Sequence, residues 1–187
     1  MIPMENYRGP EMSIEYSIVP SPLGRLLVAA TSRSASAVYF GESDAHLESS
    51  LRRQYPGARI SRDEDGFAIL KSFVGKILAY LHGRETHLDL PTDVAGTAFE
   101  LRVWEELRRI PYGATRTYSE IARAIGQPSA VRAVARACAA NPVALVVPCH
   151  RVIRADGRLA GYRGGIKRKR ALLEMESGNL FDLKRTA

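Results

Sequence analysis

The sequence is poor in cysteine, with only Cys138 and Cys149 among 187 residues. Two cysteines are too few for a disulfide framework or a cysteine-rich zinc site, and we expect no bridge between them. No apolar run approaches the roughly 20 residues of a membrane-spanning helix, and residues 1–10 lack the basic and apolar blocks of a secretion signal. No internal repeat or low-complexity tract is visible. The sequence therefore predicts a cytoplasmic protein that does not enter a membrane.

Charge is distributed unevenly between the two halves of the chain. Residues 1–90 carry 10 Lys/Arg and 11 Asp/Glu, whereas residues 91–187 carry 17 and 9. A basic half joined to a neutral half is typical of a surface for polyanions, most often nucleic acid. The alternative is a solvated basic face that only improves solubility.

The first half has the pattern of a small antiparallel sheet with a helix. Alternating and β-branched residues predict strands at 14–18, 26–28 and 37–40, with a turn at 20–24. An apolar stripe at helical spacing follows, formed by Phe67, Leu70, Val74, Ile77, Leu78 and Leu81. Residues 82–96 contain two glycines and a proline and read as a linker.

The second half carries helix signals. Thr97 and Glu100 form a capping box, and Thr117 and Glu120 form another. Gly126-Gln127-Pro128 ends the second of these helices, and a third is expected from Ser129 to Ala140. The two short helices have the length and spacing of a helix-turn-helix.

The helix from 129 to 140 is rich in alanine, with Arg132 and Arg136 four residues apart. A major-groove reader normally presents several polar side chains to the bases, and this helix offers only its arginines. It therefore favours recognition by shape and by insertion, for example into a minor groove. The alternative is an alanine-rich helix that simply packs against its neighbour.

Pro148-Cys149-His150-Arg151 follows the apolar run 143–147, which predicts a buried strand ending at a thiol. A free cysteine is only about 3% thiolate at neutral pH, so a neighbouring base or cation is needed to make it reactive. His150, Arg151 and Arg154 all lie within five residues of Cys149. The alternative is a buried, inert cysteine that acts as a small hydrophobe.

Together these pieces resemble the alkylguanine-DNA alkyltransferases, also called methylated-DNA-protein-cysteine methyltransferases, and most of all the alkyltransferase part of the bacterial adaptive-response proteins. The resemblance runs from Gly96 to Glu176 essentially without a gap, and residues 1–90 resemble the family's ribonuclease H-like N-terminal domain more weakly. The matching motifs are Phe99, Trp104, Ile110-Pro111-Tyr112-Gly113, Thr117-Tyr118-Ser119, Arg132-Ala133-Val134, Asn141-Pro142, Pro148-Cys149-His150-Arg151-Val152 and Gly161-Tyr162-Arg163-Gly164-Gly165.

The resemblance implies a catalytic group at four matched positions. Cys149 is the expected methyl acceptor, His150 its base through a bound water, and Glu176 the carboxylate that orients the imidazole. Asn141 is expected to fix the turn before the cysteine through side-chain hydrogen bonds.

The resemblance also implies a DNA surface and a pocket for a flipped base. Arg132 would fill the space left by the base, and Tyr118 would press on the backbone phosphate and place its hydroxyl near the base. Without the resemblance, Arg132 and Arg136 read as simple phosphate contacts and Tyr118 as an ordinary helix aromatic. The remaining expected DNA contacts are Ser119, Arg136 and Ala130, and the expected pocket residues are Pro148, Val152, Tyr162, Arg163 and Cys138.

The chain departs from some family members. No cysteine precedes Cys138, so the zinc site that some N-terminal domains carry is not expected. The cysteine-rich domain that lets some bacterial members activate transcription is absent, so gene induction is not expected. Arg163 stands where some relatives have a small residue, which bears on whether groups larger than methyl are accepted.

We therefore expect an α/β (α+β) protein with a sheet-and-helix domain at 1–90 and a mostly helical domain at 91–187. The expected activity is single-turnover transfer of the methyl group of 6-O-methylguanine, and of 4-O-methylthymine, from double-stranded DNA to Cys149, by a monomer with no cofactor, metal or obligate protein partner. One rival is a lesion-binding module that does not react. Another is a thiol hydrolase using Cys149 and His150, although adjacent residues rarely form a catalytic dyad.

Overall fold

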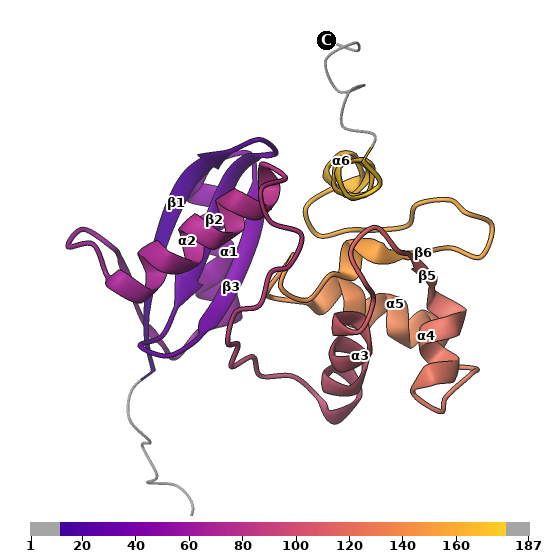
Figure 1. The fold of residues 1–187 in the computed structure, drawn as a ribbon. Helices are drawn as coiled ribbons and strands as arrows, with labels where there is room; N and C mark the ends of the chain where they lie inside the picture. The colour runs from indigo at the N-terminus through magenta and orange to yellow at the C-terminus, as the bar shows by residue number, and fades with distance from the viewer. Residues whose placement is uncertain (1–11, 179–187) are drawn as a thin grey trace, which may run out of the picture.

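The computed structural model describes residues 12–178 (Figure 1). A sheet flanked by helices comes first and a mostly helical part follows, as expected. Within residues 12–178, no helix is both long and apolar enough to cross a bilayer. The elements are β1 (Ser13–Ser21), β2 (Gly24–Ala30), β3 (Ala35–Gly41), α1 (Asp44–Gln54), β4 (Arg59–Arg62), α2 (Ala68–Leu81), α3 (Ala98–Arg108), β5 (Arg116–Thr117), α4 (Tyr118–Ala124), α5 (Val131–Ala140), β6 (Val152–Ile153) and α6 (Ile166–Glu176).

The first sheet has the order β3-β2-β1-β4. The three predicted strands pair antiparallel as β1, β2 and β3. The expectation of a wholly antiparallel sheet is wrong at β4, which pairs parallel to β1 and makes the sheet mixed. A parallel neighbour needs a crossover connection, and α1 supplies it.

Alternation along β2 sends neighbouring side chains to opposite faces of the sheet. Leu26 and Val28 join a core cluster that contains the buried residues of α2, whereas Leu27 packs in a separate cluster with Leu47 and Leu51 of α1. The two helices therefore cover opposite faces (Figure 1). The α2 cluster continues into α3, α4 and α5, so one core joins this face of the sheet to the helical part.

Both predicted capping boxes are present. The Thr97 side chain accepts from the Glu100 amide while the Glu100 carboxylate accepts from the Thr97 amide, and Thr117 and Glu120 make the same exchange. Gly126 adopts a φ of 73°, which ends α4 in the left-handed region that glycine tolerates. The helix-turn-helix is confirmed as α4 and α5, although α5 begins at Val131, two residues later than expected.

The apolar run 143–147 is buried as predicted, but it is not a regular strand. Leu145 has a φ of 72°, and only isolated bridges join this run to the sheet and to itself. The Val38 amide of β3 donates to the Pro142 carbonyl (2.8 Å), and the Ala144 amide donates to the Val38 carbonyl (3.2 Å). The segment leading to Cys149 is therefore fastened to the free edge of β3.

Candidate active site

Cys149 opens a 3₁₀ turn, Cys149–Arg151, and its side chain is 5% exposed. Asn141 Nδ2 donates to the Val147 carbonyl (2.8 Å) and to Cys149 Sγ (3.2 Å), while its Oδ1 accepts from the Val143 amide (3.0 Å). This buried amide binds both the turn and the sulfur, whereas the resemblance implies only its contact with the turn. Burial raises the pKa of the Cys149 thiol, and the hydrogen bond from Asn141 and the charge of Lys169 oppose that rise.

His150 is fully buried and its Nε2 lies 2.6 Å from Glu176 Oε1. Because a carboxylate only accepts, this contact places the ring proton on Nε2 and leaves Nδ1 as the basic nitrogen. Among the described residues, Nδ1 has no hydrogen-bond partner. Burial lowers the pKa of His150 against the pull of Glu176, so the resting ring is neutral and able to take a proton.

Glu176 is held by donors on both carboxylate oxygens. Arg151 Nε donates to Oε2 (2.8 Å) and Arg151 Nη2 to Oε1 (3.2 Å), and the Gly113 amide reaches Oε2 (3.1 Å). The Tyr80 hydroxyl donates to Oε1. Burial works against the carboxylate charge, but His150, Arg151 and Tyr80 outweigh it and lower the pKa of Glu176 to about 2. The site therefore holds a permanent anion behind the imidazole.

Gly113 has a geometric reason to be glycine. Its φ is 75°, and a Cβ there would lie 3.0 Å from the Glu176 carbonyl oxygen. A side chain would push α6 away from the loop whose amide binds Glu176.

Lys169 is a buried cation that sequence reasoning missed. Its Nζ donates to the Val152 carbonyl (2.5 Å) and the Ala160 carbonyl (3.2 Å) and lies 3.5 Å from the Tyr118 hydroxyl. Burial lowers the pKa of Lys169, whereas burial and the nearby Cys138 and Cys149 raise that of Tyr118 to about 12. Tyr118 therefore stays a neutral phenol near neutral pH.

The expected DNA-binding side chains gather on α4 and α5. Arg132 and Arg136 are exposed on one face of α5, whose opposite face buries Val134, Ala137 and Cys138. Ala130 caps the start of α5 without a side-chain bond, and Ser119 Oγ lies 3.0 Å from Thr117 Oγ1.

The expected pocket residues lie on several segments: Cys138 on α5, Pro148 and Val152 on either side of the 3₁₀ turn, and Tyr162 and Arg163 on the loop before α6. Pro148, Val152 and Cys138 are buried, and burial raises the pKa of the Cys138 thiol with Cys149 contributing. The Tyr162 hydroxyl is buried without a partner among the described residues. Arg163 is exposed and lies 4.4 Å from the centre of the Tyr39 ring, so its guanidinium points to the first sheet.

Arg168 ties the 161–165 loop to the sheet domain. Its guanidinium donates to the carbonyls of Leu23 (2.7 Å) and Gly164 (2.9 Å) and pairs with Glu42 (2.7 Å). The 161–165 loop is thus held to the sheet part of the chain at two points, by Arg168 and by Arg163 on Tyr39.

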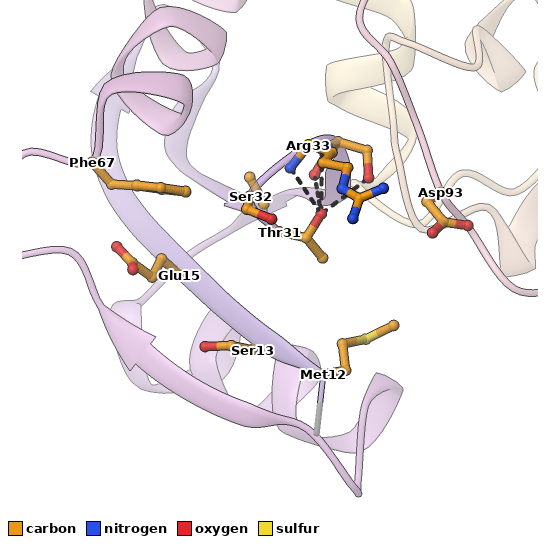
Figure 2. Close-up of a pocket in the computed structure, with 10 residues that line it drawn as sticks. Met12, Ser13, Glu15, Thr31, Ser32, Arg33, Phe67 and Asp93 are labelled. Carbon is orange, nitrogen blue, oxygen red and sulfur yellow. Dashed lines mark hydrogen bonds between the residues drawn. The ribbon is translucent and has the colours of Figure 1, made fainter. Parts of the chain in front are cut away.

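A cavity of about 580 Å³ lies elsewhere, beside the start of β1 (Figure 2). Thr31 there bonds with Ser34, and Glu15, Arg33 and Asp93 face an open space (Figure 2). None of the expected site residues lines it.

The four expected catalytic residues, Cys149, His150, Glu176 and Asn141, are linked in the structure. Asn141 donates to the Cys149 sulfur, His150 follows Cys149 in the sequence, and His150 contacts Glu176. Sequence reasoning missed Tyr80 and Lys169, and it gave Arg151 no role beyond its charge and Gly113 none beyond its place in a matching motif. Arg151 had a detectable signal, since it adjoins His150. Tyr80 lay inside an apolar helix and Lys169 inside a basic run, where nothing marks one residue out.

Two protein-family models match the chain. The 6-O-methylguanine DNA methyltransferase ribonuclease-like domain matches residues 14–94, and the DNA binding domain of the same family matches residues 98–178. The chain is 44% identical over 171 residues to the bifunctional transcriptional activator/DNA repair enzyme Ada of Escherichia coli, covering 91% of this chain and 48% of Ada. It therefore spans about half the length of that relative.

Other relatives align over most of their length. The methylated-DNA--protein-cysteine methyltransferase of Mycobacterium bovis is 44% identical over 163 residues, which is 87% of this chain and 92% of that protein. The crystal structure of the Mycobacterium tuberculosis O6-methylguanine methyltransferase matches with a TM-score of 0.74 at 40% identity, covering 88% of this chain and 93% of that one. The same mycobacterial protein in complex with DNA matches with a TM-score of 0.73, at 40% identity over 89% of this chain and 93% of that one. On these matches, and as its motifs predict, the chain belongs to the 6-O-methylguanine DNA methyltransferase family.

Proposed function

We propose that this protein repairs DNA by moving the methyl group of 6-O-methylguanine, and of 4-O-methylthymine, irreversibly onto Cys149. The observation that carries the proposal is a buried thiol next to a histidine whose Nε2 is bound to Glu176 and whose Nδ1 has no partner among residues 12–178. That arrangement is a nucleophile, a base and an orienting carboxylate. Family membership and the relatives named above support the same reaction.

The atoms and electrons of the methyl transfer balance without a cofactor. The thiol proton passes to His150 Nδ1 through a water, and Glu176 stabilises the imidazolium that results. The sulfur then attacks the methyl carbon, a carbon–sulfur bond forms, and the bond from carbon to the guanine oxygen breaks with its electrons staying on the base. A thioether has no easy leaving path, so each molecule reacts once.

In our proposal, Tyr118 and Lys169 stabilise the guanine base as it leaves the methyl group. The base leaves with an extra electron pair, and the neutral Tyr118 phenol donates a proton to a ring nitrogen as that charge develops. Lys169 Nζ, 3.5 Å from the phenol oxygen, stabilises the negative charge that then appears on Tyr118. The pair therefore improves guanine as a leaving group.

The burial of Cys149 requires the base to leave the duplex. A sulfur that is 5% exposed cannot reach a carbon inside a base stack, so the nucleotide must rotate into the pocket. In our proposal Arg132 fills the gap from α5, Ala130 lets the helix approach closely, and Ser119 and Arg136 bind phosphates. The pocket walls are Pro148, Val152, Tyr162 and Cys138, with Arg163 bracing the loop on Tyr39.

We infer that duplex DNA bearing alkylated bases is the partner and that the protein acts as a monomer without an obligate protein partner. The division into domains at 1–90 and 91–187 also stays a prediction.

Intact-mass measurement tests the reaction directly. The protein is incubated with a duplex that carries one 6-O-methylguanine, and the modified peptide is then mapped. We expect one added methylene per molecule, on Cys149, with no further uptake when duplex is in excess. An unchanged mass with the duplex still bound would instead favour the lesion-binding module.

Arg132→Ala is expected to slow repair of duplex DNA by about tenfold or more while barely changing the reaction with the free methylguanine base. Only the duplex has a gap to fill, and unstacking costs a few kcal/mol that the inserted side chain helps to offset. Single-turnover rates on the two substrates measure the difference. Arg136→Ala is the comparison from the same exposed face: losing its proposed phosphate contact should weaken duplex binding but leave the transfer rate unchanged once the duplex is saturating. Equal losses on duplex and free base in Arg132→Ala would count against flipping.

A further inference from the structure

Tyr80 brings the sheet domain into the active site. It lies near the end of α2, is 1% exposed, and donates its hydroxyl proton to Glu176 Oε1 across 96 residues of sequence. Arg151 Nη2 donates in turn to the Tyr80 oxygen (3.3 Å). Burial and the nearby Glu176 raise the pKa of Tyr80, so its hydroxyl stays protonated and remains a donor.

The donors around Glu176 divide between its two oxygens. Oε2 accepts hydrogen bonds from Arg151 Nε and the Gly113 amide. Oε1 accepts from His150, from Tyr80 and, at a longer distance, from Arg151 Nη2. Tyr112 also faces this group, with its ring edge-on to Tyr80 at a centroid distance of 5.9 Å. Among the residues that the structure describes, the hydroxyl of Tyr80 is therefore the one donor from the sheet part of the chain to Oε1, the oxygen that His150 contacts.

The position of Oε1 decides how well Glu176 can stabilise an imidazolium. Hydrogen bonds to a charged group in a buried site are strong and directional, and a carboxylate that loses one can rotate toward its remaining partners. Without Tyr80, the described partners of Oε1 are His150 itself and the longer contact from Arg151 Nη2 (3.2 Å), whereas Oε2 keeps Arg151 Nε (2.8 Å) and the Gly113 amide (3.1 Å). The balance of the remaining bonds therefore favours rotation of the carboxylate toward its Oε2 donors.

We propose that Tyr80 is a positioning residue for methyl acceptance, whose hydroxyl holds Glu176 Oε1 against His150 so that the sheet domain completes the acceptor site. The inference rests on the proposed function for its chemistry. The effect of Tyr80 on the reactivity of Cys149, however, can be measured without DNA.

Tyr80→Phe tests this, with the rate of Cys149 alkylation by iodoacetamide as the readout across pH and the labelled peptide mapped. At neutral pH we expect a loss of about tenfold, as for one hydrogen bond to a buried charge. The rate profile should also move to higher pH, because a thiol with a poorly supported base must lose its proton to solvent. At high pH the two rates should converge.

Tyr112→Phe is the matched control, since it removes a neighbouring hydroxyl that makes no hydrogen bond to Glu176 in the part of the chain described. Its rate and profile are expected to stay unchanged. A loss of stability would instead expose Cys149 as an ordinary thiol, which reacts faster and at lower pH than the buried thiol. A slower reaction whose profile moves to higher pH therefore separates positioning from a loss of stability. An unchanged rate or an unshifted profile in Tyr80→Phe, or an equal loss in Tyr112→Phe, would overturn the inference.

A double-mutant cycle locates the effect. If Tyr80 acts through Glu176, adding Tyr80→Phe to Glu176→Gln should cost little beyond Glu176→Gln alone, whereas fully additive losses would contradict the inference. The assay contains no DNA. A failure of the methylated duplex to donate its methyl group would therefore count against the proposed function and leave the role of Tyr80 intact.

Discussion

A Cys149→Ser variant is expected to take up no methyl group from a methylated duplex while still binding it. A serine hydroxyl is a far weaker nucleophile than a thiolate, and losing the nucleophile of a coupled group costs on the order of 10⁴-fold or more in rate. The pocket keeps its shape, because oxygen replaces sulfur beside Asn141 Nδ2, which can still donate. Intact mass and duplex affinity, measured on the same preparation, check both halves of the expectation.

Cys138→Ser is the matched control, as a second buried thiol on α5 whose environment also raises its pKa. It should keep single-turnover transfer. Transfer that persisted in Cys149→Ser and vanished in Cys138→Ser would show that the wrong cysteine has been assigned. Loss of duplex binding in Cys149→Ser would mean that the sulfur contributes to DNA recognition.

Glu176→Gln is expected to lose about 3–5 kcal/mol of stability, on the order of 10 °C in Tm, together with most of the reactivity of Cys149. The substitution keeps the shape of the side chain and removes its charge, so Arg151 is left buried without its counterion. The exposed fraction of the Arg151 side chain is 9% and that of Glu176 is 1%, so solvent cannot replace the lost partner. Thermal unfolding and iodoacetamide alkylation of Cys149 measure the two losses.

The pH dependence of stability provides a second test of the Glu176→Gln variant. The pKa of Glu176 is about 2 in the folded protein against an ordinary 4.5, so the unfolded chain binds a proton first as the pH falls. The stability that this carboxylate contributes is complete above about pH 4.5 and is lost as the pH falls toward 2. Glu176→Gln should lack this part of the acid transition.

Glu174→Gln is the matched control on the same helix, because Glu174 is only partly buried and makes no ion pair within residues 12–178. Its Tm and acid transition should follow those of the unchanged protein. An acid transition in Glu176→Gln as steep as that of Glu174→Gln would show that the anion behind His150 adds nothing to folding.

The sequence predicted those features of the fold whose interactions lie between residues close together in the chain. The capping boxes at Thr97 and Thr117 and the break at Gly126 are satisfied within a few residues, so they were visible in the sequence. Helix α1 was missed because it buries only Leu47 and Leu51 and is otherwise polar. Strand β4 was missed because it is short and mostly exposed and gains its partner, β1, from far away.

The run 143–147 shows how composition can mislead. Its apolar residues predict a strand, but they are buried by a turn that fits between β3 and the 3₁₀ turn, with Asn141 supplying the hydrogen bonds that a ladder would have made. In the active site, His150 was found because it follows Cys149 in the sequence, and Glu176 was found through the resemblance to the alkyltransferase family. Tyr80 and Lys169 could not be found, because each acts only through contacts made across the folded chain.

The carboxylate behind His150 has a consequence for the order in which a newly made chain becomes reactive. Domains generally fold from the N-terminal side during synthesis, at about 5–20 residues per second. Tyr80 is therefore in place first, Cys149 emerges next, and Glu176, Lys169 and Arg168 all arrive together on α6. A nascent chain carries its thiol for some time without the group that orients its base. In our proposal, Cys149 therefore accepts a methyl group only after α6 has packed into place and brought Glu176 to His150.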